Sequence, residues 1–232
     1  MNGEVAASAE RKHEPTLDVS ARATSNAKGV AEETVHFPSG TLRLEGRFEA
    51  QPGDTAVALA SAHPLYGSTM DDAVIEALRA AYRARGVSTL RFNYRGIGGS
   101  EGTPDADAGP REDLTSALAY LVQRGKRRLD VAGYSFGAWV AFTVAQSKCA
   151  ARRAVLVAPP VDAMRFEGSC DKVRLVVGAA DDHYASARSL ERLVPRWSDR
   201  ARLVVIPDAN HYFMLKLDEI TSAVEELLSG DG

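Results

Sequence analysis

The sequence predicts an α/β fold in which a mostly parallel, doubly wound sheet follows an N-terminal antiparallel hairpin. From residue 56 onward, short apolar runs alternate with amphipathic helical patterns, which is typical of parallel strands joined by helices. Before that point, two short strand-like segments flank a turn signal, which is typical of a hairpin. In addition, each group of chemically reactive residues directly follows a predicted strand, where open parallel sheets bind their ligands.

The chain is predicted to consist of a disordered tail, residues 1–32, and a single domain, residues 33–230. The tail is rich in Ala, Ser, Thr, Glu and Lys, so it cannot bury enough apolar surface to offset the entropy lost on ordering. A short helix around residues 4–12 is an alternative for part of it. Its acidic residues argue against a transit peptide, and it lacks the apolar region of a secretory signal.

The domain begins with the hairpin, whose two segments, residues 34–37 and 42–48, flank the turn Pro38-Ser39-Gly40. The second segment alternates apolar or small residues with charged ones, which predicts a strand with one face in water. Residues 56–62 form a continuous apolar run, which predicts a strand covered on both faces.

The remaining elements follow from apolar periodicity and from the glycines that end each pattern. A Gly-rich loop is expected over residues 93–110, and the helix at 185–196 is expected to stop near Pro195. The other expected helices are 71–85, 111–124, 136–146 and 218–228, and the other expected strands are 87–92, 128–134, 154–158, 173–178 and 203–206.

A candidate nucleophile lies between the strand at 128–134 and the helix at 136–146, in the motif Gly133-Tyr134-Ser135-Phe136-Gly137. A G-x-S-x-G motif at such a strand-to-helix turn lifts the serine oxygen away from the backbone, and the flanking glycines avoid a clash of Cβ atoms. A serine hydroxyl is a poor nucleophile until a base takes its proton. Ser135 is therefore a nucleophile only if the rest of the chain supplies a base and an acid.

The base is expected to be His211. Histidine titrates near neutral pH, and in this topology the base follows the nucleophile and the acid in the chain. Of the five histidines only His183 and His211 follow Ser135, and His211 lies in a turn-rich loop after the last predicted strand. His183 precedes that strand and is interpreted as a surface-loop residue.

The acid is expected to be Asp181, which with Asp182 follows the strand at 173–178. This carboxylate holds the imidazole in the required tautomer and stabilises the imidazolium. Asp182 is the second candidate and is otherwise interpreted as a solvated neighbour or a helix cap. Asp162 and Asp208 are the remaining candidates.

The negative charge that forms on the substrate oxygen needs two preorganised backbone N–H donors. One donor is expected to be the N–H of Phe136, the residue after the nucleophile. The other is expected to be the N–H of Leu65, with that of Tyr66 as the alternative, because Leu65 and Tyr66 lie in the loop after the strand at 56–62. His63 is interpreted as a hydrogen-bonding residue that shapes this loop. His63, Tyr66 and Tyr134 are expected to line the substrate pocket.

Two loops carry a resemblance to a known family. The first reads Ala62-His63-Pro64-Leu65-Tyr66-Gly67-Ser68-Thr69-Met70-Asp71, and the second reads Arg91-Phe92-Asn93-Tyr94-Arg95-Gly96-Ile97-Gly98-Gly99-Ser100-Glu101-Gly102. They resemble a small, lidless branch of serine hydrolases in the α/β-hydrolase superfamily, dienelactone-hydrolase-like or esterase-like, with a histidine-proline block before Leu-Tyr-Gly-Gly-Thr-Met-Asp. The resemblance covers residues 34–228. The sequence departs from the branch at Ser61-Ala62, where a further His-Pro pair is usual, and at Ser68, which replaces a glycine.

The resemblance implies an α/β-hydrolase fold with a minimal cap or none, and a carboxylesterase-like serine hydrolase. Small carboxylic esters or thioesters would be cleaved in a ping-pong reaction through an acyl-enzyme on Ser135. The alternative is a binding or scaffold protein that keeps the fold without turnover, and the set Ser135, Asp181 and His211 argues against it.

Composition limits the other function classes. A formal net charge of −3 does not favour nucleic-acid binding, and the absence of an apolar run near 18 residues argues against a membrane partner. Two cysteines are too few for a disulfide scaffold and fit a reducing compartment. We therefore expect a cytoplasmic protein that acts on a small acyl substrate and uses no cofactor and no metal. No feature of the sequence indicates an oligomeric state.

Overall fold

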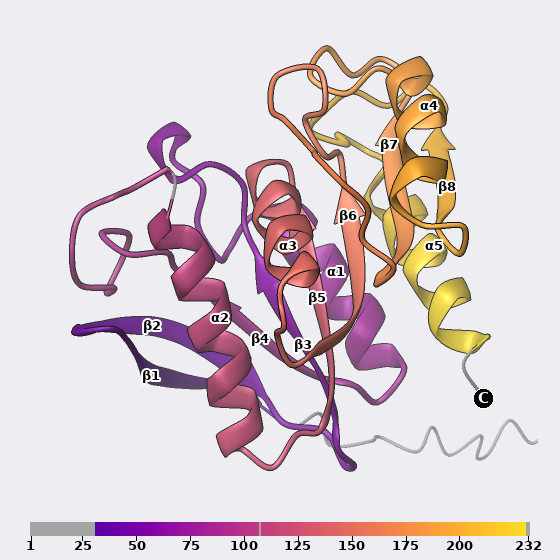
Figure 1. Ribbon diagram of the computed structural model, residues 1–232. Coiled ribbons are helices and arrows are strands. Elements are labelled where there is room, and N and C mark those ends of the chain that lie inside the picture. The colour runs from indigo at the N-terminus through magenta and orange to yellow at the C-terminus, as the bar shows by residue number, and fades with distance from the viewer. Residues whose placement is uncertain (1–30, 107, 231–232) are drawn as a thin grey trace, which may run out of the picture.

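The computed structural model describes residues 31–106 and 108–230 (Figure 1). The predicted tail, apart from residues 31 and 32, lies outside these residues. Eight strands form one sheet in the order β1-β2-β4-β3-β5-β6-β7-β8. The pairs β1–β2 and β2–β4 are antiparallel and all the other neighbours are parallel. The predicted fold class, a mostly parallel sheet with an antiparallel N-terminal hairpin, is therefore confirmed.

After the hairpin the elements alternate between strand and helix, except that β6 and β7 follow each other with only a loop between them, as the sequence predicts. The strands are β1 (Glu33–Ser39), β2 (Leu42–Glu49), β3 (Thr55–Ala60), β4 (Ser88–Phe92), β5 (Arg128–Tyr134), β6 (Ala151–Val157), β7 (Val173–Ala179) and β8 (Arg202–Ile206). The helices are α1 (Ala73–Ala84), α2 (Ala108–Gln123), α3 (Phe136–Gln146), α4 (Ala187–Trp197) and α5 (Leu217–Ser229), with a short 3₁₀ turn η1 (Pro64–Tyr66) after β3.

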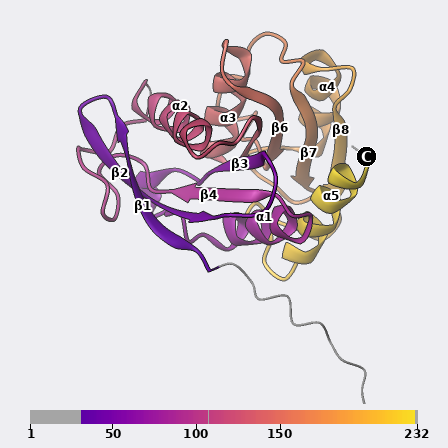
Figure 2. The same ribbon diagram turned by 90° about the horizontal axis from the view of Figure 1, so that it is seen from below.

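Helices cover both faces of the sheet. Helices α1 and α5 pack together on one face, and α2, α3 and α4 lie on the other (Figures 1 and 2). The two layers form separate hydrophobic clusters, and strand side chains contribute to both. This double covering explains why the central strands are mostly apolar without alternation: in β5 every residue after Arg128 is buried, and the one charged residue among them, Asp130, pairs with Arg153 of β6.

The predicted helix ends differ from the observed ones by at most three residues, and the largest difference is at α2, which begins at Ala108, inside the loop expected over 93–110. Helix α4 continues past Pro195 to Trp197. A proline in the last turn removes only one hydrogen bond of the helix. Trp197 is almost fully buried and its ring packs against Phe142 and Phe166, so burial of a large aromatic side chain offsets that loss.

The Gly-rich loop after β4 is held by a buried carboxylate that the sequence did not reveal. Asp113 of α2 is fully buried and accepts hydrogen bonds from the Arg95 backbone N–H at 2.9 Å and from the Ser39 hydroxyl at 2.8 Å. Its carboxylate also pairs with the Arg95 guanidinium at 2.7 Å. Arg95 is thereby fixed inside the fold as a structural residue.

No helix in the described part of the chain is long and apolar enough to cross a membrane. Cys149 and Cys170 are both free thiols.

Candidate functional site

Ser135 forms the turn between β5 and α3, with Tyr134 ending the strand and Phe136 beginning the helix. Its backbone has φ 53° and ψ −117°, a conformation that costs free energy for a residue with a side chain. The Ser135 N–H donates to the Val157 carbonyl oxygen at 2.9 Å, which ties the turn to β6. The fold thus holds the serine in a strained position at the carboxyl edge of the sheet.

The two glycines of the motif are required by close backbone contacts. A Cβ on Gly133 would overlap the carbonyl group of Gly137, and a Cβ on Gly137 would overlap the carbonyl oxygens of Ala60 and Ser61. These neighbours are backbone atoms, which cannot move aside as a flexible side chain could. The tight approach of α3 to β3 and β5 is therefore possible only with glycine at both positions.

His211 lies beside the serine. Its Nε2 is 2.9 Å from the Ser135 hydroxyl oxygen, although the two residues are far apart in the sequence. The loop after β8 carries His211, and the buried Tyr134 hydroxyl donates to the His211 carbonyl oxygen at 3.1 Å. Tyr134 therefore ties the histidine loop to the strand that carries the nucleophile, a role that the motif alone does not reveal.

The carboxylate beside His211 belongs to Asp182 and not to Asp181, which corrects the sequence-based choice. Asp182 Oδ2 lies 2.7 Å from His211 Nδ1, and the Asp182 side chain is fully buried. Its second oxygen, Oδ1, accepts from the backbone N–H groups of Tyr184 at 2.7 Å and Ala185 at 3.2 Å. Both carboxylate oxygens are thus hydrogen-bonded, one to the ring and one to the loop.

Asp181 is exposed and contributes its backbone to the site. Strand β7 runs to Ala179, one residue beyond the predicted end, and pairs there with Ile206 of β8. The Asp181 N–H then donates to the Ala209 carbonyl oxygen at 2.8 Å, so the chain turns inward only at Asp182. The strand length sets which of the two adjacent carboxylates reaches the histidine.

Asp162 and Asp208, the two remaining candidates for the acid, are placed differently from Asp182. Asp162 accepts from the Ser186 N–H at 2.8 Å and from the Ser189 hydroxyl at 2.6 Å, at the start of α4. Asp208 is exposed, and so is His183, which the sequence predicts to be a surface-loop residue.

The hydrogen bonds of the His211 imidazole define which of its two nitrogens carries the proton. A carboxylate only accepts hydrogen bonds, so His211 Nδ1 carries the ring proton and donates it in a hydrogen bond to Asp182, which leaves Nε2 as the acceptor for the Ser135 hydroxyl. Because the Asp182 side chain is buried with both oxygens bonded, its position is fixed before any substrate arrives. The three groups can therefore transfer the serine proton to Nε2 while the carboxylate stabilises the resulting imidazolium.

The expected oxyanion donors differ in availability. Phe136 is the first residue of α3, so its N–H has no partner inside the helix and belongs to the donors that a helix N-terminus presents. The Leu65 N–H donates to His63 Nδ1 at 3.2 Å, and the Tyr66 N–H donates to the His63 carbonyl oxygen at 3.0 Å. Both candidates for the second donor are engaged inside the turn η1, so the identity of that donor stays a prediction.

His63 shapes the turn, as expected from the sequence. It occupies the position before η1, and its ring contacts Phe136 with 4.6 Å between centroids. Burial lowers the pKa of His63 below its ordinary value of 6.5. The ring therefore stays neutral at neutral pH, and Nδ1 keeps the lone pair that accepts the Leu65 N–H.

Replacing His63 tests this hydrogen bond. His63→Ala removes the acceptor and is expected to lower kcat/KM about tenfold, the effect of one lost hydrogen bond. His63→Asn places a side-chain oxygen at the same capping position and is expected to stay within about threefold of the parent protein. Steady-state hydrolysis of a chromogenic ester measures both. Equal loss in the two variants would mean that the ring itself, and not its acceptor atom, is needed.

A pocket of about 820 Å³ surrounds Ser135. His63, Tyr66 and Tyr134 line it as predicted, whereas Leu65 does not. Its lining consists of Ala62, His63, Tyr66, Gly67, Ser68, Asp72, Ala73, Val74, Tyr134, Ser135, Phe136, Pro160, Ala163, Met164, Tyr184, His211 and Tyr212. Its volume is in the range of sites that hold small molecules.

The mouth of this pocket is open and its rim is apolar. Residues 158–172 between β6 and β7, all of them described, form neither helix nor strand, so no cap domain covers the serine. Seven large apolar or aromatic side chains of the described residues are exposed, and six of them lie in the loops that carry the pocket: Leu65, Tyr66, Tyr184, Tyr212, Met214 and Leu215. The site is therefore accessible from solvent without a lid movement.

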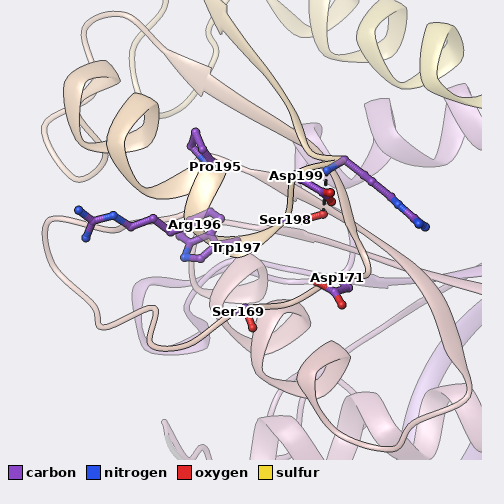
Figure 3. Close-up of a pocket in the computed structure, with 8 residues that line it drawn as sticks. Ser169, Asp171, Pro195, Arg196, Trp197, Ser198 and Asp199 are labelled. Carbon is purple, nitrogen blue, oxygen red and sulfur yellow. Dashed lines mark hydrogen bonds between the residues drawn. The ribbon is translucent and has the colours of Figure 1, made fainter.

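A smaller pocket of about 340 Å³ lies at the end of α4, between Ser169 and Ser198 (Figure 3). Ser135, Asp182 and His211 are not among the residues that line it. Arg196 and Arg200 are among its lining residues, and in Figure 3 the Arg196 side chain extends away from Ser169 and Asp171. Among the described residues, no three His, Cys, Asp or Glu side chains come together as a metal site.

Comparison with known proteins places these features in a family context. Residues 62–171, which include the loop η1 and Ser135, match the model of the alpha/beta hydrolase family. A solved protein of unknown function from Agrobacterium tumefaciens, named as a candidate α/β hydrolase, is 30% identical. The match covers 86% of this chain and 95% of that one with a TM-score of 0.74.

Two further solved structures are similar. An α/β serine hydrolase homologue from Coxiella burnetii is 27% identical, with 84% of this chain and 96% of that chain covered and a TM-score of 0.74. A serine hydrolase without a lid from Xanthomonas campestris is 24% identical, with 86% and 94% covered and a TM-score of 0.73, and supports the fold alone.

Proposed function

The chain belongs to the α/β-hydrolase family, and on that premise we propose that it is a serine hydrolase of small carboxylic esters or thioesters. Ser135 is the nucleophile, His211 the base and Asp182 the acid. The observation that carries the proposal is the continuous hydrogen-bonded chain from Ser135 through His211 to Asp182, with distances of 2.9 Å and 2.7 Å. It opens into a pocket large enough for a small acyl substrate.

The first half of the reaction forms an acyl-enzyme. The Ser135 oxygen attacks the acyl carbonyl carbon while His211 Nε2 takes the hydroxyl proton, and Asp182 stabilises the imidazolium. The carbonyl oxygen becomes an oxyanion, which the Phe136 N–H at the start of α3 stabilises. When this intermediate collapses, the bond from the acyl carbon to the leaving oxygen or sulfur breaks, the imidazolium gives its proton to that atom, and the alcohol or thiol departs.

The second half releases the acid. A water molecule gives a proton to His211 Nε2 and attacks the acyl carbon, and the second intermediate collapses as the proton returns to Ser135. Each step uses side chains of this chain and water, so the mechanism requires no cofactor. The open mouth of the pocket admits this water directly.

Labelling with a fluorophosphonate probe tests the proposal. We expect one covalent adduct on Ser135 in the parent protein, detected by peptide mass spectrometry, and none in Ser135→Ala. His211→Ala should slow labelling by orders of magnitude, because the base is lost while the serine remains. Ser147, exposed at the end of α3, provides a matched control: Ser147→Ala should label at the parental rate.

The outcomes of these experiments distinguish a serine hydrolase from a binding or scaffold protein. Labelling that persists in Ser135→Ala would refute Ser135 as the nucleophile. A folded protein that neither labels nor hydrolyses esters would instead be a binding or scaffold protein without turnover. Matched oxygen and thiol esters of one short acyl group, compared by kcat/KM, then distinguish esterase from thioesterase activity.

A further inference from the structure

The pocket around Ser135 extends across the edge of the sheet and has two chemically different ends. At one end Pro160, Ala163 and Met164 provide an apolar lining, and Met164 packs against the hydrophobic cluster of α2, α3 and α4. At the other end lie Asp72 and Val74 at the start of α1, where Val74 belongs to the cluster of α1 and α5. A bound ester would therefore meet a different environment on each side of the nucleophile.

Asp72 is the only carboxylate among the described residues that line the pocket. It occupies the position before α1, yet its side chain caps no N–H of that helix. It accepts instead from the Ser68 hydroxyl, at the position where the resembling branch has glycine, and weakly from the Thr69 N–H at 3.4 Å. Helix capping therefore does not account for this carboxylate.

Asp72 differs from the neighbouring Asp71 in its ion pairs. Within residues 31–106 and 108–230 no Lys, Arg or His nitrogen lies in ion-pair distance of its carboxylate. The adjacent Asp71, by contrast, pairs with Arg47 at 3.4 Å and with Arg91 at 2.6 Å. The two neighbouring carboxylates thus have different surroundings: Asp71 pairs with arginines outside the pocket, whereas Asp72 lines the pocket.

The rest of the lining leaves this negative charge uncompensated. It contains no Lys or Arg, and four tyrosines, Tyr66, Tyr134, Tyr184 and Tyr212, present aromatic rings. Burial raises the pKa of the Tyr134 hydroxyl, and the charge of Asp72 raises it further. A carboxylate beside aromatic rings is the setting in which proteins bind ammonium groups.

We propose that the pocket selects substrates by charge: the Asp72 end binds a cationic, ammonium-bearing group of the ester, and the Pro160–Met164 end binds an apolar group. Asp72 is the specificity-determining residue, and an anionic group at its end is repelled. This inference rests on the proposed function, because it names the substrate class of the same site.

Three butyrate esters of nearly equal shape test the selection. The alcohols are choline, which carries a trimethylammonium group, 3,3-dimethylbutanol, its neutral analogue, and isethionate, which carries a sulfonate. A second series places the same three end groups on the acyl chain of an ethyl ester, so that either orientation in the pocket is sampled. Each kcat/KM is divided by the rate constant of hydroxide hydrolysis, which removes intrinsic reactivity.

We expect the cationic ester to exceed the neutral one about tenfold in one of the two series, and the anionic ester to be the poorest. Asp72→Asn should lower this cation-to-neutral ratio to about one, whereas Asp71→Asn should keep it. The ratio does not depend on the fraction of active protein, so a partly unfolded variant still gives an answer. In the parent protein, a salt concentration of about 0.5 M should reduce the ratio, because the site is open to solvent.

Equal rates for the cationic and neutral esters in both series would overturn the charge selection while leaving the serine hydrolase intact. A ratio that survives in Asp72→Asn would overturn the role of Asp72. Absence of turnover for all six esters together with absence of fluorophosphonate labelling would refute the proposed function itself.

Discussion

Asp182→Asn is expected to lower kcat by about 10⁴-fold, while Asp181→Asn leaves it within about twofold of the parent protein. An asparagine at 182 can keep its side-chain oxygen on the N–H groups of Tyr184 and Ala185, so the loop is preserved. Its amide then donates toward His211 Nδ1, which selects the tautomer with a proton on Nε2. That tautomer cannot accept the proton of the Ser135 hydroxyl. Steady-state kinetics on a chromogenic ester measure the loss.

The adjacent aspartate makes this comparison well matched. Both substitutions remove one negative charge from the same loop, but only Asp182 is buried against the histidine. The thermal midpoint of each variant checks that folding is retained. A large loss of kcat in Asp181→Asn, with Asp182→Asn nearly active, would mean that the loop rearranges when substrate binds.

Gly137→Ala is expected to destabilise the fold by at least about 4 kcal/mol, and to prevent accumulation of folded protein if the parent is only marginally stable. The new Cβ would overlap the carbonyl oxygens of Ala60 and Ser61, so α3 would have to move away from β3. Such a movement would also displace Ser135 from His211. Chemical unfolding followed by circular dichroism measures the change in stability.

Gly230→Ala is the control for that substitution. Gly230 has φ −79°, and the nearest atom to a Cβ there is the Leu227 carbonyl oxygen at 3.8 Å. We expect a change within about 0.5 kcal/mol. If Gly137→Ala were as stable as this control, the close approach of α3 to the sheet would not be needed for folding.

Much of the fold can be predicted from the periodicity of apolar residues in the sequence, because strands that are buried on both faces are continuous apolar runs. The limits of β5 and α3 agree with the prediction, since an apolar run, a turn motif and a second apolar run leave no other division. What local rules do not show is why the last turn of α4 tolerates Pro195: the packing of Trp197 against Phe142 and Phe166 is a contact between distant segments. The contact of the buried Asp113 carboxylate is also one between distant segments, since its partner Arg95 lies in the loop after β4.

For the candidate site, too, the sequence predicts some features and misses others. Chain order leaves His211 as the histidine after the last strand, and the structure brings it next to Ser135. The choice between Asp181 and Asp182 depends on one residue of strand length, which the pairing of Ala179 with Ile206 determines. Sequence patterns locate strand ends only within a few residues. The engagement of the Leu65 N–H by His63 Nδ1 likewise depends on the geometry of a three-residue turn.

The hydrogen bond from the Asp181 N–H to the Ala209 carbonyl oxygen has a practical consequence. It joins the acid loop to the histidine loop through main-chain atoms, while the Asp181 side chain is exposed. A change of the Asp181 side chain therefore leaves this main-chain hydrogen bond available unless proline is introduced, and position 181 offers an attachment point for a fluorophore or spin label one residue from Asp182. Cys170 is buried, and burial raises the pKa of its thiol, so a cysteine introduced at 181 would react ahead of it. Arrival of a substrate could then be followed spectroscopically at the site itself.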